Sequence, residues 1–392
     1  MPKTDEARRL LDRLVAFPSV SRDSNLPLVH FVESYLAGHG ITSVRVPNED
    51  GSKAALYAHA GPEIDGGVVL SGHTDVVPVD GQDWSSDPFT VTERDGRLYG
   101  RGTCDMKGFD ALSLAAMAQA ATLHKQGRLK RPLQIALSYD EEVGCTGAPP
   151  MIDHMVSHGL PRASTVIVGE PSMMKAVTGH KGGIGFAVHI KGYEVHSSLV
   201  HKGVNAIMWG AKLVDWANRM NAENAAKTPS AIAATFEPPY TTLHVGTIKG
   251  GTAHNITAGD CWFGFDFRIV PGDSLPDWVD RFKAEVARLE AEMKAIHPSA
   301  AIEFPQRFHV PGLVPEEDGE AEALVRRLTG DNASHVVSYG TEAGQFQERG
   351  YSAVVCGPGD IAQAHQPDEY ITIEQFTAGQ QFMDDLLADL CR

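Results

Sequence analysis

The sequence predicts an α/β protein in which a domain with a mixed sheet flanked by helices is interrupted by a smaller inserted α+β domain. Three observations predict this. Helical and strand patterns alternate over roughly the first 180 of the 392 residues, strands and two long amphipathic helices follow from about Gly179, and the first pattern returns from about Val314.

The first segment alternates amphipathic helices with short apolar runs. Residues 4–16 place Leu10, Leu11 and Leu14 on one helical face. Short apolar runs bounded by turn residues are typical of buried strands. The expected elements are helices at 4–16, 27–38, 111–124 and 151–158, and strands at 67–70, 133–137 and 165–168.

The middle and final segments complete this pattern. The middle segment predicts strands at 184–190, 241–248 and 261–269 and helices at 205–221 and 278–295. The final segment predicts a helix at 314–328, a strand at 353–356 and a helix at 373–390. Because the outer segments share one pattern, we expect them to form one discontinuous domain that is interrupted by an insertion between about Gly179 and Val314.

Composition limits the class of partner. With 34 Lys and Arg against 50 Asp and Glu, the net charge is −16, and no basic patch interrupts this excess. We therefore expect no nucleic-acid partner. The five cysteines form no CxxC pair, which favours a reducing compartment over a disulfide framework or a thiolate zinc site. Without an apolar signal segment or a run of about 18 apolar residues, we expect a cytoplasmic protein that has no membrane partner.

Five clusters carry residues suited to chemistry, and three of them directly follow predicted strands. Ligands bind at the carboxyl ends of strands in open α/β sheets. The clusters are SGHTDVVP with His73 and Asp75, GRGTCDMKG with Asp105, SYDEEVGCTG with Asp140, Glu141 and Glu142, IVGEPS with Glu170, and GPGDIAQAHQPDEY with His365.

Each cluster alone also has an ordinary structural explanation, as capping residues, turn glycines or a solvated acidic loop. Three adjacent carboxylates after a strand would repel one another unless a positive charge or a proton were present. Histidines and carboxylates at separate loop positions, without cysteine, describe a site for one or two divalent ions. Zinc is the first expectation.

In this order and spacing, the clusters resemble the M20 family of co-catalytic metallopeptidases and amidohydrolases over nearly the whole chain. The resemblance implies a zinc-peptidase-like catalytic domain that holds two divalent ions, zinc or alternatively cobalt. The implied ligands are His73 and Glu170 for one ion, Glu142 and His365 for the other, and Asp105 as a bridge between both.

The resemblance also implies roles around the ions. Asp75 would orient His73, and Glu141 would be the general base that takes a proton from the attacking water and returns it to the leaving amine. Asp140 has no corresponding role. A cis peptide is expected between Asp105 and Met106.

The resemblance implies that residues 181–308 are the inserted domain and that residues 1–180 and 309–392 form the catalytic domain. It also implies that the inserted domain forms a homodimer and lends residues to the neighbouring active site. His196 in GYEVHSS matches the family's oxyanion histidine, and Asn255 and Arg268 match positions that hold a substrate α-carboxylate. The open alternatives are a surface histidine and an arginine that pairs across strands.

The C-terminal segments are most similar to members that remove the acetyl group from N-acetylornithine in arginine biosynthesis. Glu342 in TEA could pair with the ω-ammonium of such a small-molecule substrate, or it could cap a helix behind Thr341. Other N-acyl amino acid acylases, succinyl-diaminopimelate desuccinylases and dipeptidases of the family are the alternative enzymes. A non-catalytic metal-binding protein is the alternative of another class.

Overall fold

The structure is a computed structural model that describes residues 3–392. It divides into two compact units, each described here by itself. The first comprises Met1–Gly179, Leu313–Val336 and Thr341–Arg392, and the second comprises His180–Gly312 and Val337–Gly340. The predicted insertion, residues 181–308, lies inside the second unit.

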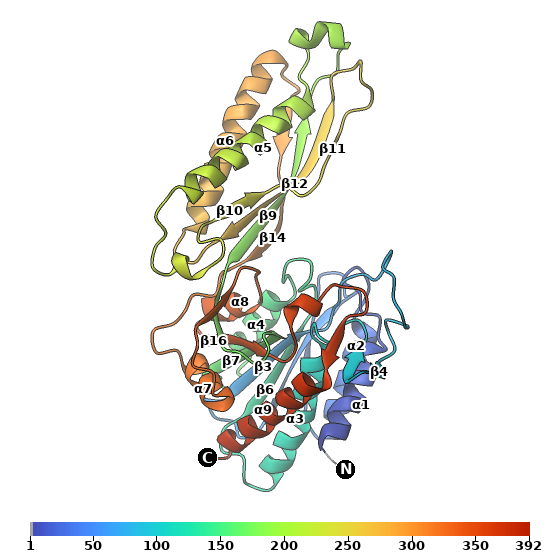
Figure 1. Cartoon of the computed structure of the whole chain (residues 1–392), viewed down its shortest axis with the longest axis vertical. Helices are drawn as coiled ribbons and strands as arrows, with labels where there is room; N and C mark the ends of the chain where they lie inside the picture. Colours follow the sequence, from blue (N-terminus) through green and yellow to red (C-terminus); the bar gives the residue numbers. More distant parts are fainter. Residues whose placement is uncertain (1–2) are drawn as a thin grey trace. The chain divides into compact units, whose positions relative to one another are not determined.

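The first unit is built on an eight-stranded mixed sheet with the strand order β1-β2-β6-β3-β7-β16-β8-β15 (Figure 1). Strands β6, β3, β7 and β16 are parallel, and β2 is antiparallel to β6. The strands are β1 Ser43–Pro47, β2 Ala54–Ala60, β3 Val68–His73, β6 Leu133–Ser138, β7 Thr165–Pro171, β8 Val177–His180, β15 His335–Val337 and β16 Ser352–Gly357, and a smaller sheet holds β4 Thr92–Arg94, β5 Arg97–Tyr99 and β17 Tyr370–Thr372. The predicted fold class is confirmed.

Helices cover both faces of this sheet, because its central strands are apolar on both sides. The helices α1 Lys3–Val15, α2 Leu26–Gly38, α3 Lys107–Lys125, α7 Glu320–Thr329 and α9 Ile373–Leu390 share one hydrophobic cluster with it. The helices α4 Ala148–Ser157 and α8 Ala343–Glu348 contact each other and pack on the sheet outside that cluster.

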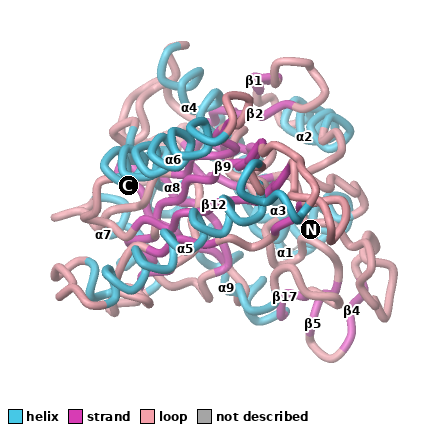
Figure 2. Tube along the Cα trace, turned by 90° about the horizontal axis from the view of Figure 1, so that it is seen from above, coloured by secondary structure: helices cyan, strands magenta, loops and turns pink. Residues whose placement is uncertain are grey.

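The second unit is a six-stranded antiparallel sheet with two long helices on it, and Figure 2 shows both helices running over the strands. Its elements are β9 Gly182–Lys191, η1 Ser197–Lys202, α5 Ala206–Ala225, η2 Ala233–Thr235, β10 Thr242–His244, β11 Ile248–Gly250, β12 Asp260–Ile269, α6 Leu275–Ile296, β13 Ala301–Glu303 and β14 Gln306–Val310. Aromatic side chains such as Phe265, Phe267 and Phe282 fill the core between helices and sheet.

Several element boundaries differ from the prediction. The strand expected at 241–248 is two strands, β10 and β11, because the chain leaves the ladder between them, around Gly246. Helix α7 begins at Glu320 rather than at Val314, after Pro315 and Gly319. Helix α3 begins at Lys107, directly after a cis peptide between Asp105 and Met106, and this cis bond confirms the expectation. None of the helices within residues 3–392 is both long enough and apolar enough to cross a membrane.

Candidate metal centre

The parallel strands β3, β6 and β7 end at the same edge of the sheet, and the candidate ligands collect there. His73 is the last residue of β3, Glu170 lies at the end of β7, and Glu141 and Glu142 follow β6 in a turn. Asp105 precedes α3. His365 follows the short helix η3, Ile361–Gln363, with a left-handed backbone (φ 63°) that is uncommon for a non-glycine residue.

Asp105 lies between the two histidines. Its Oδ1 is 3.0 Å from His73 Nε2, and its Oδ2 is 3.3 Å from His365 Nε2. One further carboxylate approaches the same nitrogen of each histidine: Glu170 Oε1 is 3.8 Å from His73 Nε2, and Glu142 Oε2 is 2.9 Å from His365 Nε2. The structure therefore brings all five predicted ligands together, as two imidazoles that share one carboxylate.

These residues fit a divalent cation. Ligand atoms of His73, Asp105 and Glu142 lie within 4.8 Å of one another, and so do those of His73, Glu141 and Glu170. Buried oxygens of Glu142 (Oε1) and Glu170 (Oε1) find no hydrogen-bond partner among residues 3–392. Because a buried carboxylate without a partner is costly, a cation is the natural complement of this set of oxygen and nitrogen donors.

The pKa values of the clustered carboxyl groups also indicate a site for a cation. Burial, with the nearby Asp105 charge, raises the pKa of Glu142 to about 8 and that of Glu170 well above its usual range. Burial also raises the pKa of Glu141 to about 7. Although burial opposes it, hydrogen bonds from His365 and His73 hold the pKa of Asp105 below its usual range. So many buried acids cannot all ionise without added positive charge, and a bound cation supplies that charge.

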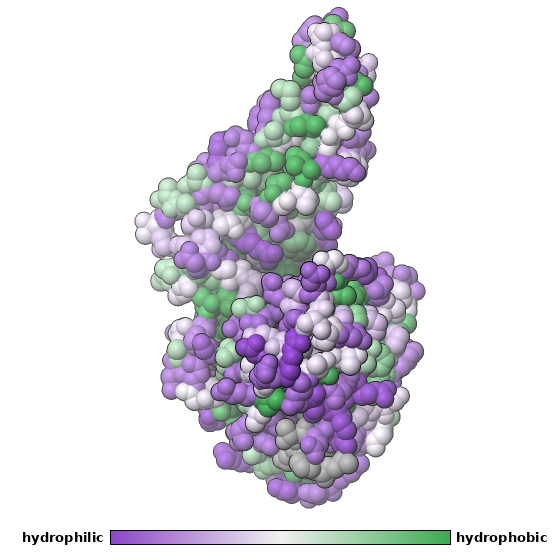
Figure 3. All heavy atoms as spheres, turned by 45° about the vertical axis from the view of Figure 1, so that its right-hand side comes forward, coloured by the Kyte–Doolittle hydropathy of each residue, from purple (hydrophilic) through white to green (hydrophobic). Residues whose placement is uncertain are grey.

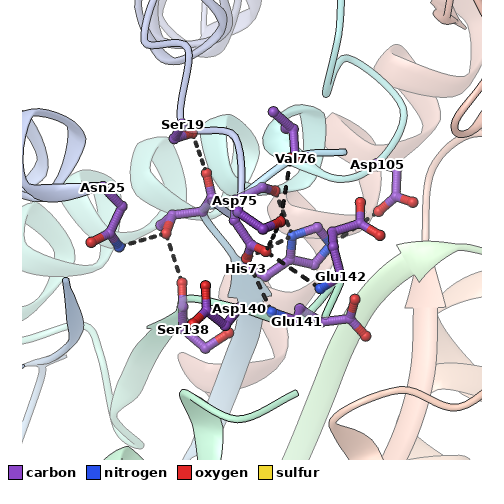
Figure 4. Close-up of polar contacts among 12 residues, drawn as sticks. Ser19, Asn25, His73, Asp75, Val76, Asp105, Ser138, Asp140, Glu141 and Glu142 are labelled. Carbon is purple, nitrogen blue, oxygen red and sulfur yellow. Dashed lines mark hydrogen bonds and ion pairs between the residues drawn. The ribbon is translucent and has the colours of Figure 1, made fainter. Parts of the chain in front are cut away.

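Asp75 acts differently from the prediction (Figure 4). His73 Nδ1 lies 2.9 Å from the backbone carbonyl oxygen of Asp75, whereas the carboxylate is 3.7 Å away. That carboxylate instead accepts hydrogen bonds from the backbone N–H groups of Glu141 (3.1 Å) and Glu142 (3.3 Å) and from the Ser21 hydroxyl (2.7 Å). The main chain of Asp75 therefore orients His73, and its carboxylate fixes the Glu141–Glu142 turn.

Two residues that the sequence did not single out complete this turn. Cys145 is buried, and its thiol donates to Glu141 Oε1 at 3.2 Å. Lys53 pairs with Asp140 at 2.5 Å, and this contact gives Asp140 a partner outside the group of candidate ligands. Cys145 lies inside the SYDEEVGCTG motif, whereas Lys53 is distant in sequence and could not have been found from it.

Glu342 lies in the same part of the first unit, under the strand ends. It is 1% exposed, and its carboxylate accepts hydrogen bonds from the hydroxyls of Ser138 and Ser71, the latter at 3.3 Å. Burial raises its pKa to about 7. The carboxylate makes no capping hydrogen bond for α8, since the Thr341 hydroxyl accepts from the N–H of Ala343 instead.

His196, Asn255 and Arg268 belong to the second unit. The exposed His196 is the N-cap of η1 and forms an isolated bridge with Ile256. Asn255 is adjacent to it, because its carbonyl oxygen accepts from the N–H of Ser197 at 2.8 Å. Arg268 is 43% exposed, with a guanidinium nitrogen 3.7 Å from Asp266 on its own strand.

These three residues do not form one group within the unit. The His196 and Asn255 segments follow the Lys191 end of β9 and precede the Asp260 end of β12. Arg268 pairs with Gly183 at the other end of the same ladder. At about 3.3 Å per residue, the eight residues from Asp260 to Arg268 span roughly 26 Å, too far for one small substrate to touch both ends.

Known proteins resemble the chain over its whole length. The family model described as peptidase family M20/M25/M40 matches residues 69–389. The acetylornithine deacetylase of Pasteurella multocida is 34% identical over 398 residues, covering 100% of both chains. The acetylornithine deacetylase of Myxococcus xanthus is also 34% identical, covering 98% of this chain and 97% of its own.

A solved structure of an M20 family protein has the same fold. An M20 family metallo-carboxypeptidase from Sulfolobus solfataricus superposes with a TM-score of 0.79 at 17% identity, covering 99% of each chain. Its similarity is one of fold, while the curated relatives share sequence over the ligand clusters as well. The chain therefore belongs to peptidase family M20/M25/M40 and is a metal-dependent amide hydrolase.

Proposed function

We propose that the protein removes the acetyl group from N-acetyl-L-ornithine, giving L-ornithine and acetate, in the cytoplasm as a step of arginine biosynthesis. One observation supports the reaction type: His73 and His365 both lie next to the Asp105 carboxylate, and Glu141 lies beside this group. The names of the full-length relatives support the substrate.

The five ligands would hold two divalent ions. In this assignment His73 and Glu170 would hold one ion, Glu142 and His365 would hold the other, and Asp105, which lies close to both histidines, would be shared between them. Their oxygen and nitrogen donors suit zinc, with cobalt as a substitute. Two such ions supply an activated water and polarise the acyl carbonyl of the substrate.

Glu141 is the proposed general base. It would take a proton from the water as the water oxygen bonds to the acyl carbon, and it would later give that proton to the amide nitrogen, so that the C–N bond breaks and acetate and the free amine leave. A pKa near 7 suits a group that must both accept and release a proton at neutral pH. The Cys145 thiol and the carboxylate of Asp75 position Glu141 for this task.

We further propose that two copies of the chain associate through the second unit. Strand β11 lies at the sheet edge and carries Ile248 (54% exposed), and the nearby start of α5 carries the exposed Ile207 (40%), next to Met208 (61%). Figure 3 brings the β11 side of Figure 1 forward and shows hydrophobic residues grouped on this unit. Since the His196 segment lies beyond the Asp260 end of β12 and Arg268 lies near its other end, a substrate that uses both needs them from two copies.

Metal removal and a panel of amides test the proposal. Dialysis against a chelator should abolish activity, and Zn²⁺ or Co²⁺ should restore it. With the reloaded enzyme, kcat/KM should be highest for N-acetylornithine among N-acetylornithine, N-acetylmethionine, N-succinyl-diaminopimelate and a dipeptide. A higher value for another member of the panel would identify a different amide hydrolase. Full activity in protein shown to be metal-free would overturn the metal assignment.

The role of Glu141 can be tested beside its neighbour. Glu141→Gln should lower kcat by at least about a hundredfold while metal content is retained. Asp140→Asn is the matched control, because Asp140 pairs with Lys53 and is not among the grouped ligand atoms. If Glu141→Gln instead lost an ion, Glu141 would be a ligand beside His73 and Glu170 rather than the base.

A further inference from the structure

A buried ion pair lies behind the candidate metal centre, among residues to which the assignment above gives no role. Arg101 and Glu369 are each 1% exposed, and Arg101 Nη1 is 2.7 Å from Glu369 Oε2. Charged side chains are almost never fully buried unless they are paired. Replacing such a pair by apolar residues is often neutral or stabilising, so stability alone does not account for it.

The other oxygen of Glu369 holds the backbone of the shared ligand. Glu369 Oε1 accepts hydrogen bonds from the N–H of Cys104 at 2.9 Å and from the N–H of Asp105 at 3.0 Å. The N–H of Gly100 also donates to the Glu369 carbonyl oxygen at 2.9 Å. Glu369 thereby fixes the peptide from which the Asp105 carboxylate projects toward both histidines.

The guanidinium of Arg101 connects Glu369 to the segment that holds His365. Arg101 Nη2 donates to Gln82 Oε1 at 2.5 Å, and Gln82 Nε2 donates to the His365 carbonyl oxygen at 2.9 Å. Arg101 Nη1 also approaches the Gln366 carbonyl oxygen at 3.3 Å. These contacts hold a histidine whose left-handed backbone would otherwise relax.

We propose that Gln82, Arg101 and Glu369, here called the Arg101 clamp, are positioning residues that set the separation and orientation of Asp105 and His365. Arginine suits this task, because its planar fork reaches a carboxylate and an amide oxygen at the same time. The clamp acts only through these ligands, so the inference rests on the two-metal site proposed above.

The test is metal binding by Glu369→Gln, measured as stoichiometry by mass spectrometry and as the visible absorption of the Co²⁺ form. The neutral amide forms no ion pair, and its single oxygen cannot accept from both Arg101 and the N–H groups of Cys104 and Asp105. One of the two ions should therefore bind about ten- to a hundredfold more weakly, and the Co²⁺ bands should change. Asp389→Asn is the matched control. Asp389 pairs with Arg131 (2.7 Å) and Arg327 (3.3 Å) in the same unit, and this variant should lose thermal stability without changing either metal readout.

Gln82→Ala is the second variant. It keeps the buried Arg101–Glu369 ion pair and removes the link from Arg101 to His365, together with the acceptor of the Trp84 Nε1–H at 3.2 Å. One ion should therefore bind more weakly, while the melting temperature of the metal-free protein should fall less than in Glu369→Gln. If Glu369→Gln does not fold, Gln82→Ala decides the question by itself.

The clamp would be overturned if folded Glu369→Gln bound both ions with wild-type affinity and showed an unchanged Co²⁺ spectrum. If Glu369→Gln does not fold, the same result in Gln82→Ala would overturn it. A wild-type protein that binds fewer than two ions would instead overturn the two-metal site, so the two failures are distinguishable.

Discussion

At the residue scale, Glu342 shows how burial changes the role of a carboxylate. The sequence suggested that it reads the ω-ammonium of the substrate, but its oxygens accept hydrogen bonds from Ser71 and Ser138, and burial raises its pKa to about 7. These contacts favour a positioning role. We therefore expect Glu342→Gln to lower kcat/KM for N-acetylornithine and for neutral N-acetylmethionine by factors within about threefold of each other.

The control for this comparison is Glu348→Gln, which changes an exposed glutamate of the same helix and should leave both rates near wild type. A loss confined to N-acetylornithine would show that Glu342 contacts the cationic end of the substrate.

His180, also at the residue scale, predicts a pH dependence of stability. Burial lowers its pKa to about 4, although Nδ1 lies 2.9 Å from the Lys181 carbonyl oxygen. An unfolded histidine titrates near pH 6.5, so between about pH 6.5 and 4 the unfolded chain binds more protons than the folded one. This residue should therefore lower stability as pH falls through that window, by up to about 1.4 kcal/mol per pH unit.

The variant His180→Asn removes the titrating ring but can keep the donor to Lys181. The difference between its melting temperature and that of the wild type should be constant above about pH 7 and should shift in favour of the variant below pH 6.5. Exposed His30→Asn is the control for the loss of one histidine. A difference that does not change with pH would contradict the prediction.

At the element scale, the contact of α3 with β7 depends on a glycine. A Cβ atom at Gly169 would lie 2.1 Å from two ring carbons of Phe109, which is buried in the core. Gly169→Ala should therefore lower the free energy of unfolding by about 1–3 kcal/mol and also weaken metal binding through the adjacent Glu170. Gly264→Ala in β12 is the control, because a Cβ there meets nothing within 4 Å. Equal melting temperatures for the two variants would count against this packing argument.

At the scale of the whole molecule, the prediction concerns association. If two copies join along β11, the double variant Met208→Glu and Ile248→Glu should sediment as a single chain, because charge on an apolar contact is costly to desolvate. It should also lose deacetylase activity, since His196 would no longer reach a partner site. Ile296→Glu, a similarly exposed apolar position on α6, should keep the mass of the wild type. If the wild-type protein itself sedimented as a single chain and hydrolysed the substrate in that state, the proposed dimer would be refuted.

The sequence predicted the long elements well. The closing helix at 373–390 has the predicted bounds, and the strands that lead to His73, Glu142 and Glu170 lie where apolar runs precede polar clusters. It missed the hairpin of Ser43–Pro47 and Ala54–Ala60, which joins the sheet through the pairing of its second strand with the distant Leu133–Ser138. Local periodicity over so few residues does not distinguish a strand from a loop.

By itself, the sequence determined the fold class, the family and the residue types of the metal centre, because those follow from the order of strands and from clusters that each lie at one strand end or turn. Only the tertiary structure decided which atom does what. Asp75 orients His73 through its carbonyl oxygen and the Glu141–Glu142 turn through its carboxylate. Glu342 is enclosed by serines, and Arg101 connects Asp105 to His365. Apart from the contact between His73 and Asp75, these contacts join residues tens to hundreds of positions apart. Hydrogen-bond geometry at about 3 Å is set by how whole elements pack, which spacing along the chain does not encode.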